Sequence, residues 1–127
     1  MTDQTKTILV VINDLFFYTK LRDALLPQGY KLERARTQED FASKAAAIGP
    51  DAVVMNLNDL SLDPFRALTL LKADPVLAKV PVLAFANHEE VETWHRAKTL
   101  GVSKIVSRNE FSARTSALVQ EVMGGRP

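Results

Sequence analysis

The sequence contains no cysteine, which excludes disulfide scaffolds, thiolate metal sites and cysteine nucleophiles. Glycine is also scarce, with five residues among 127. No glycine-rich loop follows the first apolar run, where the sequence reads INDLFF, and this argues against a P-loop or a dinucleotide site. The apolar run at 8–12 is too short for a signal peptide or a membrane span. We therefore expect a cytoplasmic protein with no membrane partner.

Net charge is nearly absent too, because 16 basic and 15 acidic residues give +1. The balance is uneven, since residues 94–127 hold six basic and two acidic residues and the remainder carries −3. Such a segment either faces acidic partners or is a solvated surface, and the second case is the more common. With 46% hydrophobic and 24% charged residues, the composition is that of a globular protein. The length predicts a single domain over 1–127, with an ordered core at about 6–123.

Short apolar runs alternate along the chain with amphipathic segments of helical length. Because parallel strands need a crossover between them, this alternation predicts a doubly wound, five-stranded parallel sheet in a three-layer α/β/α sandwich. We expect strands at 7–12, 31–36, 51–57, 82–86 and 104–107, the second at an edge and the third in the centre. We expect helices after a cap at Asp14, at 38–48 after a capping box of Thr37 and Asp40, at 64–73 after a cap at Asp63, after a cap formed by Asn87 and Glu90, and after a cap at Asn109.

In sheets of this kind the binding crevice lies beyond the carboxyl ends of the strands. The segments that lead there are ILVVIND, DAVVMN, PVLAFAN and AKTLGVSKIVSRN. On these segments the chain resembles a receiver domain of the two-component response-regulator superfamily over essentially its whole length. The resemblance implies the (βα)5 receiver fold, which is flavodoxin-like, and a role in phosphorelay signal transduction.

The resemblance also shows which functional groups differ. In family members the first strand ends in two acidic residues that hold Mg²⁺, and those positions are Ile12 and Asn13 here. The phosphoryl-accepting aspartate falls on Asn56, whose neutral amide is a poor nucleophile and supplies no carboxylate to a cation. We therefore expect a degenerate receiver, or pseudo-receiver, that is not phosphorylated at Asn56. We expect no cofactor, and Mg²⁺ binding that is weak or absent.

Three further positions of the phosphorylation switch differ from the family. The hydroxyl residue that would contact the phosphoryl group falls on Ala86, and the aromatic switch residue falls on Ile105. The lysine that would pair with the phosphoryl group falls on Arg108, with Asn109 in place of the proline that usually follows. The resemblance thus implies a retained fold and lost switching chemistry.

A displaced carboxylate is an alternative in which phosphorylation or metal binding is retained. Asp14 lies one residue beyond the second acidic position and could approach the pocket. Asp51 and Asp59 are weaker candidates for the same role. As the N-cap of a helix, however, Asp14 has a structural role, and we favour that role.

Two surfaces are candidates for partner binding. Leu15 and Phe16 are expected near the rim of the crevice, where they contact a partner, close the pocket, or simply repack locally. Trp94 lies on an apolar helical stripe, which favours core packing, and its indole needs a polar partner. In receivers the fourth helix, fifth strand and fifth helix form the usual partner and dimer face. Trp94, His95 and Lys104 are therefore candidates for contacting another signalling protein or a second copy of the chain.

The sequence contains no recognisable catalytic constellation. His88 and His95 have no carboxylate pair at a metal-binding spacing, and no nucleophile-elbow sequence surrounds a serine. The expected function is a non-catalytic signalling module, not an enzyme, that acts through protein–protein interaction and independently of phosphorylation. The alternative is nucleic-acid binding, for which a reading helix and stacking aromatics are lacking. The basic residues that would carry it are Arg96, Lys98, Lys104, Arg108 and Arg114.

Overall fold

A computed structural model describes residues 5–59 and 62–124, so both ends of the expected 1–127 domain lie outside the described residues. Five parallel strands form one sheet in the order β2-β1-β3-β4-β5. This order confirms the predicted doubly wound fold, with β2 at an edge and β3 in the centre. The strands are β1 (Thr7–Val11), β2 (Lys31–Arg34), β3 (Ala52–Asn56), β4 (Val82–Ala86) and β5 (Lys104–Ser107).

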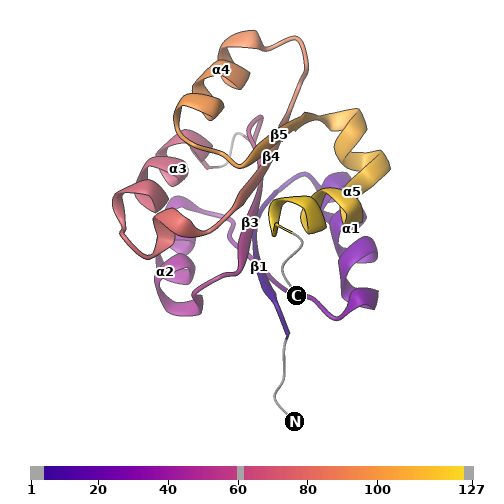
Figure 1. Cartoon of the computed structure of the whole chain (residues 1–127), viewed down its shortest axis with the longest axis horizontal. Helices are drawn as coiled ribbons and strands as arrows, with labels where there is room; N and C mark the ends of the chain where they lie inside the picture. Colours follow the sequence, from indigo (N-terminus) through magenta and orange to yellow (C-terminus); the bar gives the residue numbers. More distant parts are fainter. Residues whose placement is uncertain (1–4, 60–61, 125–127) are drawn as a thin grey trace.

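Helices cover both faces of the sheet and complete the predicted three layers (Figure 1). They are α1 (Leu15–Leu25), α2 (Gln38–Ile48), α3 (Pro64–Ala73), α4 (Val91–Thr99), α5 (Arg108–Val122) and two short 3-10 helices, η1 (Leu26–Gln28) and η2 (Leu77–Lys79). α1 and α5 pack on one face, where Phe111 contacts a core that includes Ile8. α2, α3 and α4 pack on the other face around Leu9 and Phe41. Neighbouring residues of β1 thus serve opposite cores, as the pleat requires.

Helix starts agree with the sequence at three places and differ at two. Asp14, Thr37 and Asp63 cap α1, α2 and α3 through side-chain oxygens that accept backbone N–H groups, as predicted. The predicted cap at Asn109 is wrong, because the Ser107 Oγ accepts from the Glu110 N–H at 3.1 Å and α5 begins at Arg108.

The predicted capping pair of Asn87 and Glu90 is also wrong. The Asn87 side chain accepts from the Glu89 N–H at 3.0 Å, and Glu89 lies before the first residue of α4, Val91. Glu90 takes the N-cap position and makes no capping hydrogen bond with its side chain. The first turn of α4 therefore depends on contacts from elsewhere in the fold.

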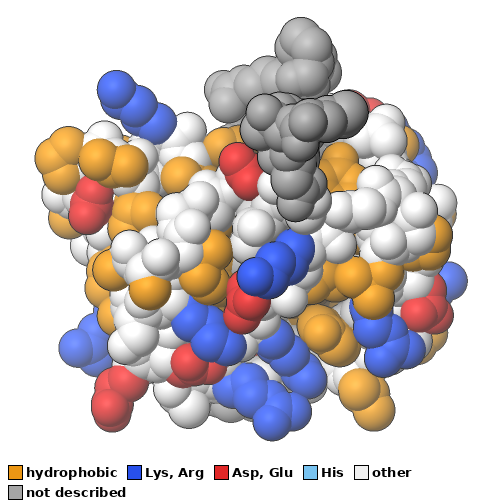
Figure 2. Space-filling model, turned by 90° about the horizontal axis from the view of Figure 1, so that it is seen from below, with side chains coloured by type: hydrophobic (Ala, Val, Ile, Leu, Met, Phe, Trp, Pro, Cys, Tyr) orange, Lys and Arg blue, Asp and Glu red, His pale blue; other side chains and the backbone are white. Residues whose placement is uncertain are grey.

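Charges of both signs share the face of the molecule that is seen from below Figure 1. Figure 2 shows Lys and Arg side chains interspersed with Asp and Glu there. A face of mixed charge lacks the single-sign field that attracts a polyanion from a distance. None of the helices in the described part of the chain is long and apolar enough to cross a lipid bilayer.

Candidate functional site

The residues predicted to form the site do meet at one edge of the sheet, where the strands end. Asn56 is the last residue of β3, Ala86 the last of β4, and Ser107 the last of β5. Asn13 and Asp14 follow β1 directly and lead into α1. Parallel strands bring these ends together, so this edge is the candidate site.

Asn56 is almost fully buried at the centre of this edge, with 5% of its surface exposed. Its Oδ1 accepts a hydrogen bond from the Asn58 N–H at 2.9 Å, and its carbonyl accepts from the Asp59 N–H at 3.2 Å. The side-chain amide thus holds its own loop in a local turn. The side chain at this position is therefore neutral, and its oxygen is engaged in a structural hydrogen bond.

Two further predicted site positions belong to the hydrophobic core. Ile12 and Ala86 are both fully buried, Ile12 in the α1/α5 core and Ala86 in the core on the opposite face. Ile105 is partly buried and packs against the same core as Ala86. These side chains provide apolar surface where a cation or a phosphoryl group would need oxygen or nitrogen ligands.

Asn13 and Arg34 tie the loops after β1 and β2 together. The Asn13 side chain donates to the Arg36 carbonyl at 3.2 Å. The Arg34 guanidinium donates to the Ile12 carbonyl at 3.1 Å and to the Asn13 carbonyl at 3.2 Å, and it lies 4.3 Å from the Tyr18 ring centroid. The positive charge of Arg34 is therefore held beside the carbonyls of the two residues that follow β1.

The carboxylates considered as replacements accept backbone N–H groups. The Asp14 carboxylate is exposed and accepts from the Phe16 and Phe17 N–H groups at 2.9 and 3.3 Å, which confirms its capping role. The Asp59 carboxylate accepts from the Asn13 N–H at 2.8 Å. The Asp51 carboxylate accepts from the Thr7 N–H at 2.8 Å, at the opposite edge of the sheet from Asn56.

These carboxylates do not gather into a ligand set. In residues 5–59 and 62–124, no group of three or more His, Asp or Glu side chains is placed to hold a metal ion. The positions that would supply oxygen ligands at the end of β1 and β3 are an isoleucine and two asparagines. This donor set does not fit a Mg²⁺ ion, which prefers several carboxylate and water oxygens in an octahedron.

Arg108 lies at the rim of the edge, as the first residue of α5. It is exposed and lines a small polar cavity of 240 Å³ together with Asn87, His88, Glu89, Ser107 and Asn109. The cavity is separate from Asn56, which does not line it.

The predicted partner surfaces are exposed to different degrees. Leu15 and Phe16 are 68% and 59% exposed on α1, and Phe16 forms an edge contact with Phe17. They stand out from the surface and so do not close the crevice. The groove beside them has a volume of 460 Å³ and is also lined by Thr19, Lys20 and Asp23.

The three candidate residues on α4 and β5 differ in their contacts. Trp94 is half-buried against the core, and its indole N–H donates to the Asn87 carbonyl at 3.0 Å, which is the polar partner expected for it. His95 is exposed on the same helix. Lys104 pairs with Glu121 at 3.4 Å, and Glu121 also pairs with Arg114.

Arg114, a basic residue of the nucleic-acid alternative, is also paired with carboxylates of its own helix. It makes a 2.6 Å ion pair with Glu110 as well as its contact with Glu121. The hydrogen bond to Glu110, followed by the charge of Glu121, raises the pKa of the guanidinium above its ordinary value. α5 departs from helical geometry at this residue.

Sequence reasoning missed three residues that shape the site. Arg34 was expected only as a charge on an edge strand, Asn58 had no assigned role, and Phe65 was not singled out. The Asn58 side chain bridges two loops, and the Phe65 ring supports Arg96 at 4.2 Å. Asn87 is 29 residues from Asn58 in the sequence and Arg96 is 31 residues from Phe65, so local patterns carry no signal for these contacts.

Comparison with known structures defines the class of fold. The chain matches the phosphorylated cyanobacterial phytochrome response regulator RcpA with a TM-score of 0.82, 16% identity and 97% coverage of both chains. A putative response regulator from Chloroflexus aurantiacus J-10-fl matches with a TM-score of 0.85, 17% identity, and coverage of 97% of this chain and 100% of that one. The chain therefore has the fold of response-regulator receiver domains.

Two other comparisons bear on the site and on the relatives. The receiver domain of the sensor histidine kinase PA1611 from Pseudomonas aeruginosa PAO1, solved with a magnesium ion in its active-site cleft, matches with a TM-score of 0.81, 18% identity, and coverage of 94% and 98%. Protein RcaC of Microchaete diplosiphon is 26% identical over 94 residues, which are 74% of this chain. The chain spans only 14% of the length of RcaC. No family model matches the chain.

Proposed function

We propose that the chain is a non-catalytic signalling module with a receiver fold, which is not phosphorylated at Asn56 and acts by binding another protein. The observation that carries this proposal is the burial of the Asn56 amide and the hydrogen bond that it makes. The amide is buried, and its Oδ1 is committed to the Asn58 N–H. An amide nitrogen has no nucleophilic lone pair to attack a phosphodonor, and an acyl phosphate requires a carboxylate.

The surroundings of Asn56 support the same proposal. Ile12 and Ala86 are core side chains, and the Arg34 guanidinium lies on the carbonyls at the end of β1. A divalent cation would meet this fixed positive charge, and residues 5–59 and 62–124 offer it no group of three or more His, Asp or Glu side chains. Mg²⁺ binding at this edge is therefore expected to be weak or absent, and the module needs no cofactor.

Protein binding is the mode of action that the described surface supports best. The exposed pair Leu15 and Phe16 offers apolar area beside the sheet edge, and exposed rings of this kind are typical of protein contacts. A homodimer through α4, β5 and α5 is a second arrangement, for which His95 and Trp94 lie on the relevant helix.

Nucleic-acid binding is the less favoured function. Two of its five candidate residues, Lys104 and Arg114, are paired with Glu121, and a third, Arg96, lies over the Phe65 ring. Basic side chains already engaged within the protein neutralise fewer phosphates, so fewer counterions leave the nucleic acid on binding.

A phosphorylation assay tests the proposal directly. The protein is incubated with acetyl phosphate and Mg²⁺, and its intact mass is measured, with a phosphorylatable receiver domain treated in parallel as the positive control. We expect no phosphoryl adduct on this chain. A hydroxylamine-sensitive phosphoryl adduct would show an acyl phosphate, and finding it on Asp14 or Asp59 would overturn the proposal of a module that works without phosphorylation.

A further inference from the structure

Among the five α-helices of the described chain, α4 has the fewest buried residues. Ala97 alone is buried in it, whereas each of the other α-helices buries at least two. Its N-cap, Glu90, makes no capping hydrogen bond. A helix with little buried area and an uncapped start is stabilised mainly by whatever tertiary contacts reach it.

One such contact is a hydrogen-bonded bridge that we call the Asn58 latch, formed by the side chain of Asn58 with Asn87 and Glu90. The Asn58 Oδ1 accepts from the Asn87 N–H at 2.8 Å, and the Asn58 Nδ2 donates to the Glu90 Oε1 at 2.8 Å. The latch extends at both ends. The Asn56 Oδ1 accepts from the Asn58 N–H, and the Asn87 carbonyl accepts from the Trp94 indole at 3.0 Å.

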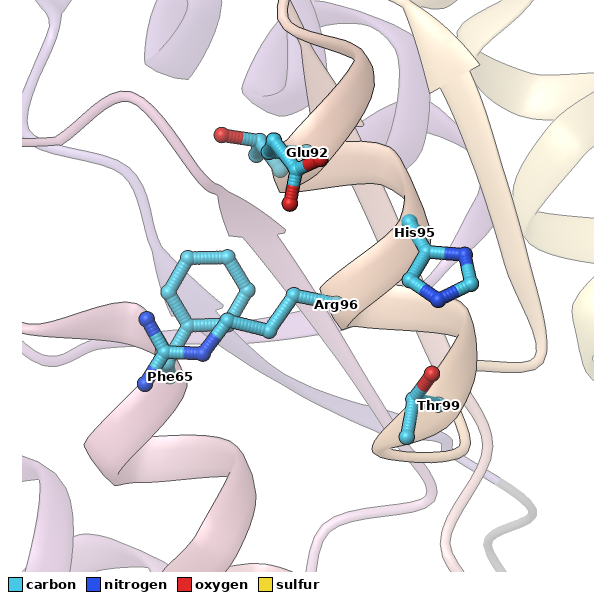
Figure 3. Close-up of a pocket in the computed structure, with 6 residues that line it drawn as sticks. Phe65, Glu92, His95, Arg96 and Thr99 are labelled. Carbon is cyan, nitrogen blue, oxygen red and sulfur yellow. The ribbon is translucent and has the colours of Figure 1, made fainter.

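A second contact holds α4 further along its length. The Arg96 side chain reaches from α4 towards α3 and places its guanidinium over the ring of Phe65, 4.2 Å from the ring centroid (Figure 3). Phe65 lies in the first turn of α3. Both contacts therefore come from residues that follow β3, one from its loop and one from the helix after it.

We infer that the residues following β3 set the position of α4, with Asn58 as the positioning residue, and that releasing the Asn58 latch frees α4. The path from Asn56 to Trp94 runs through Asn58 and Asn87 alone, so it needs neither a hydroxyl at Ala86 nor an aromatic at Ile105. A partner that draws Asn58 away would shift the population towards a released α4 and uncover the half-buried side of Trp94. This inference holds whether or not Asn56 can be phosphorylated.

Trp94 provides a direct readout, because it is the only tryptophan in the chain. The experiment compares Asn58→Ala with the unmodified full chain by acrylamide quenching of tryptophan emission and by hydrogen exchange of the α4 amides. Losing the latch should raise Trp94 quenching and speed exchange in the first turns of α4 by about fivefold, with protection of the sheet amides unchanged.

Matched variants separate the latch from general loosening. Gln28→Ala removes a side-chain amide whose Nε2 donates to the Ser116 Oγ at 2.6 Å, between α5 and the segment after α1. This variant should leave Trp94 quenching unchanged. Glu90→Ala removes one latch bond together with the bond from the Thr93 hydroxyl at 3.2 Å, whereas Glu90→Gln keeps an oxygen acceptor for both donors at this exposed position. We expect Glu90→Ala to raise quenching and Glu90→Gln to restore it.

The outcomes decide the inference. If Asn58→Ala and Glu90→Ala both fold and both leave Trp94 quenching and α4 exchange at the unmodified values, the latch does not position α4. If Asn58→Ala does not fold, the Glu90 pair alone decides, because Glu90 is exposed and its substitution removes no core contact. Equal loosening of α4 and the sheet would also contradict the inference, since it would show a global effect.

Discussion

Asn56 shows how one residue can keep a structural role where a reactive one is expected. Its Oδ1 makes the same kind of acceptor contact that a carboxylate oxygen could make, so the turn after β3 forms without the charge. The difference between the two groups is chemical, because an amide, unlike a carboxylate, cannot form an acyl phosphate. The fold at this point is therefore independent of the reaction that the position could support.

The Asn56→Asp variant tests that separation. We expect it to fold, because an aspartate oxygen can still accept from the Asn58 N–H, and to remain unphosphorylated by acetyl phosphate with Mg²⁺. The reason is that Ile12 and Asn13 supply no carboxylate to hold the metal. Intact mass spectrometry gives the result, and an aspartyl phosphate on this single variant would contradict the explanation.

Arg34 is the second residue whose role is structural at the site. Its guanidinium satisfies two carbonyls at the end of β1 and stacks on Tyr18. We expect Arg34→Ala to lower the free energy of unfolding by about 1 to 3 kcal/mol, because partly buried acceptors lose a charged donor. Urea denaturation measures the change.

Arg36→Ala is the matched control for that prediction. Arg36 is exposed, and its hydrogen bonds with Asn13 and Asp40 are made by its backbone, so truncating its side chain should change the unfolding free energy by less than about 0.5 kcal/mol. Equal effects of the two substitutions would show that the Arg34 contacts contribute nothing specific.

At the scale of elements, the sequence predicts what depends on local chemistry. Alternating apolar and amphipathic segments define the strands and helices, and Asp14, Thr37 and Asp63 cap the helices that they precede. Ser107 and Asn109 are both good capping residue types two positions apart, so composition cannot decide between them. The strand end fixes the choice, because β5 stops at Ser107 and leaves its side chain free to cap α5.

Ser107→Ala and Asn109→Ala together test this assignment. Ser107→Ala removes the Oγ that accepts from the Glu110 N–H and should cost about 1 kcal/mol of stability. Asn109→Ala should change stability by less than about 0.5 kcal/mol, since Asn109 lies inside the first turn and is exposed. Thermal unfolding of both variants gives the comparison, and the reverse ranking would refute the Ser107 cap.

The contacts between elements explain what the sequence did not predict. Arg34 reaches across strands to β1, and Asn58 reaches from the β3–α3 loop to the start of α4. Each is a polar residue at a loop or an edge, where sequence alone favours a solvated side chain. Only the strand order brings their partners within hydrogen-bond distance.

At the scale of the whole molecule, the fold depends on residues other than those of the candidate site's chemistry. Two hydrophobic cores on opposite faces of the sheet bury the strand residues. Fold and function are separable in this way because function depends on a few side chains at the strand ends.

The charge distribution gives a prediction at this scale. We expect no measurable binding to random-sequence DNA or RNA at physiological salt, because three of the five candidate basic residues, Arg96, Lys104 and Arg114, are paired or stacked within the chain. Fluorescence anisotropy with labelled oligonucleotides at low and physiological salt measures it. Binding that persists at physiological salt and falls steeply as salt is raised further would favour the nucleic-acid function.

The most direct test of the central claim is an amide NMR spectrum of the isotope-labelled protein with and without Mg²⁺ and beryllofluoride, a phosphoryl mimic. The account predicts that resonances around Asp14, Asn56 and Arg108 keep their positions, because the edge holds a neutral amide, core side chains and a fixed guanidinium. Clustered shifts of those resonances would show that the edge still binds a cation or a phosphoryl group, and would contradict the account.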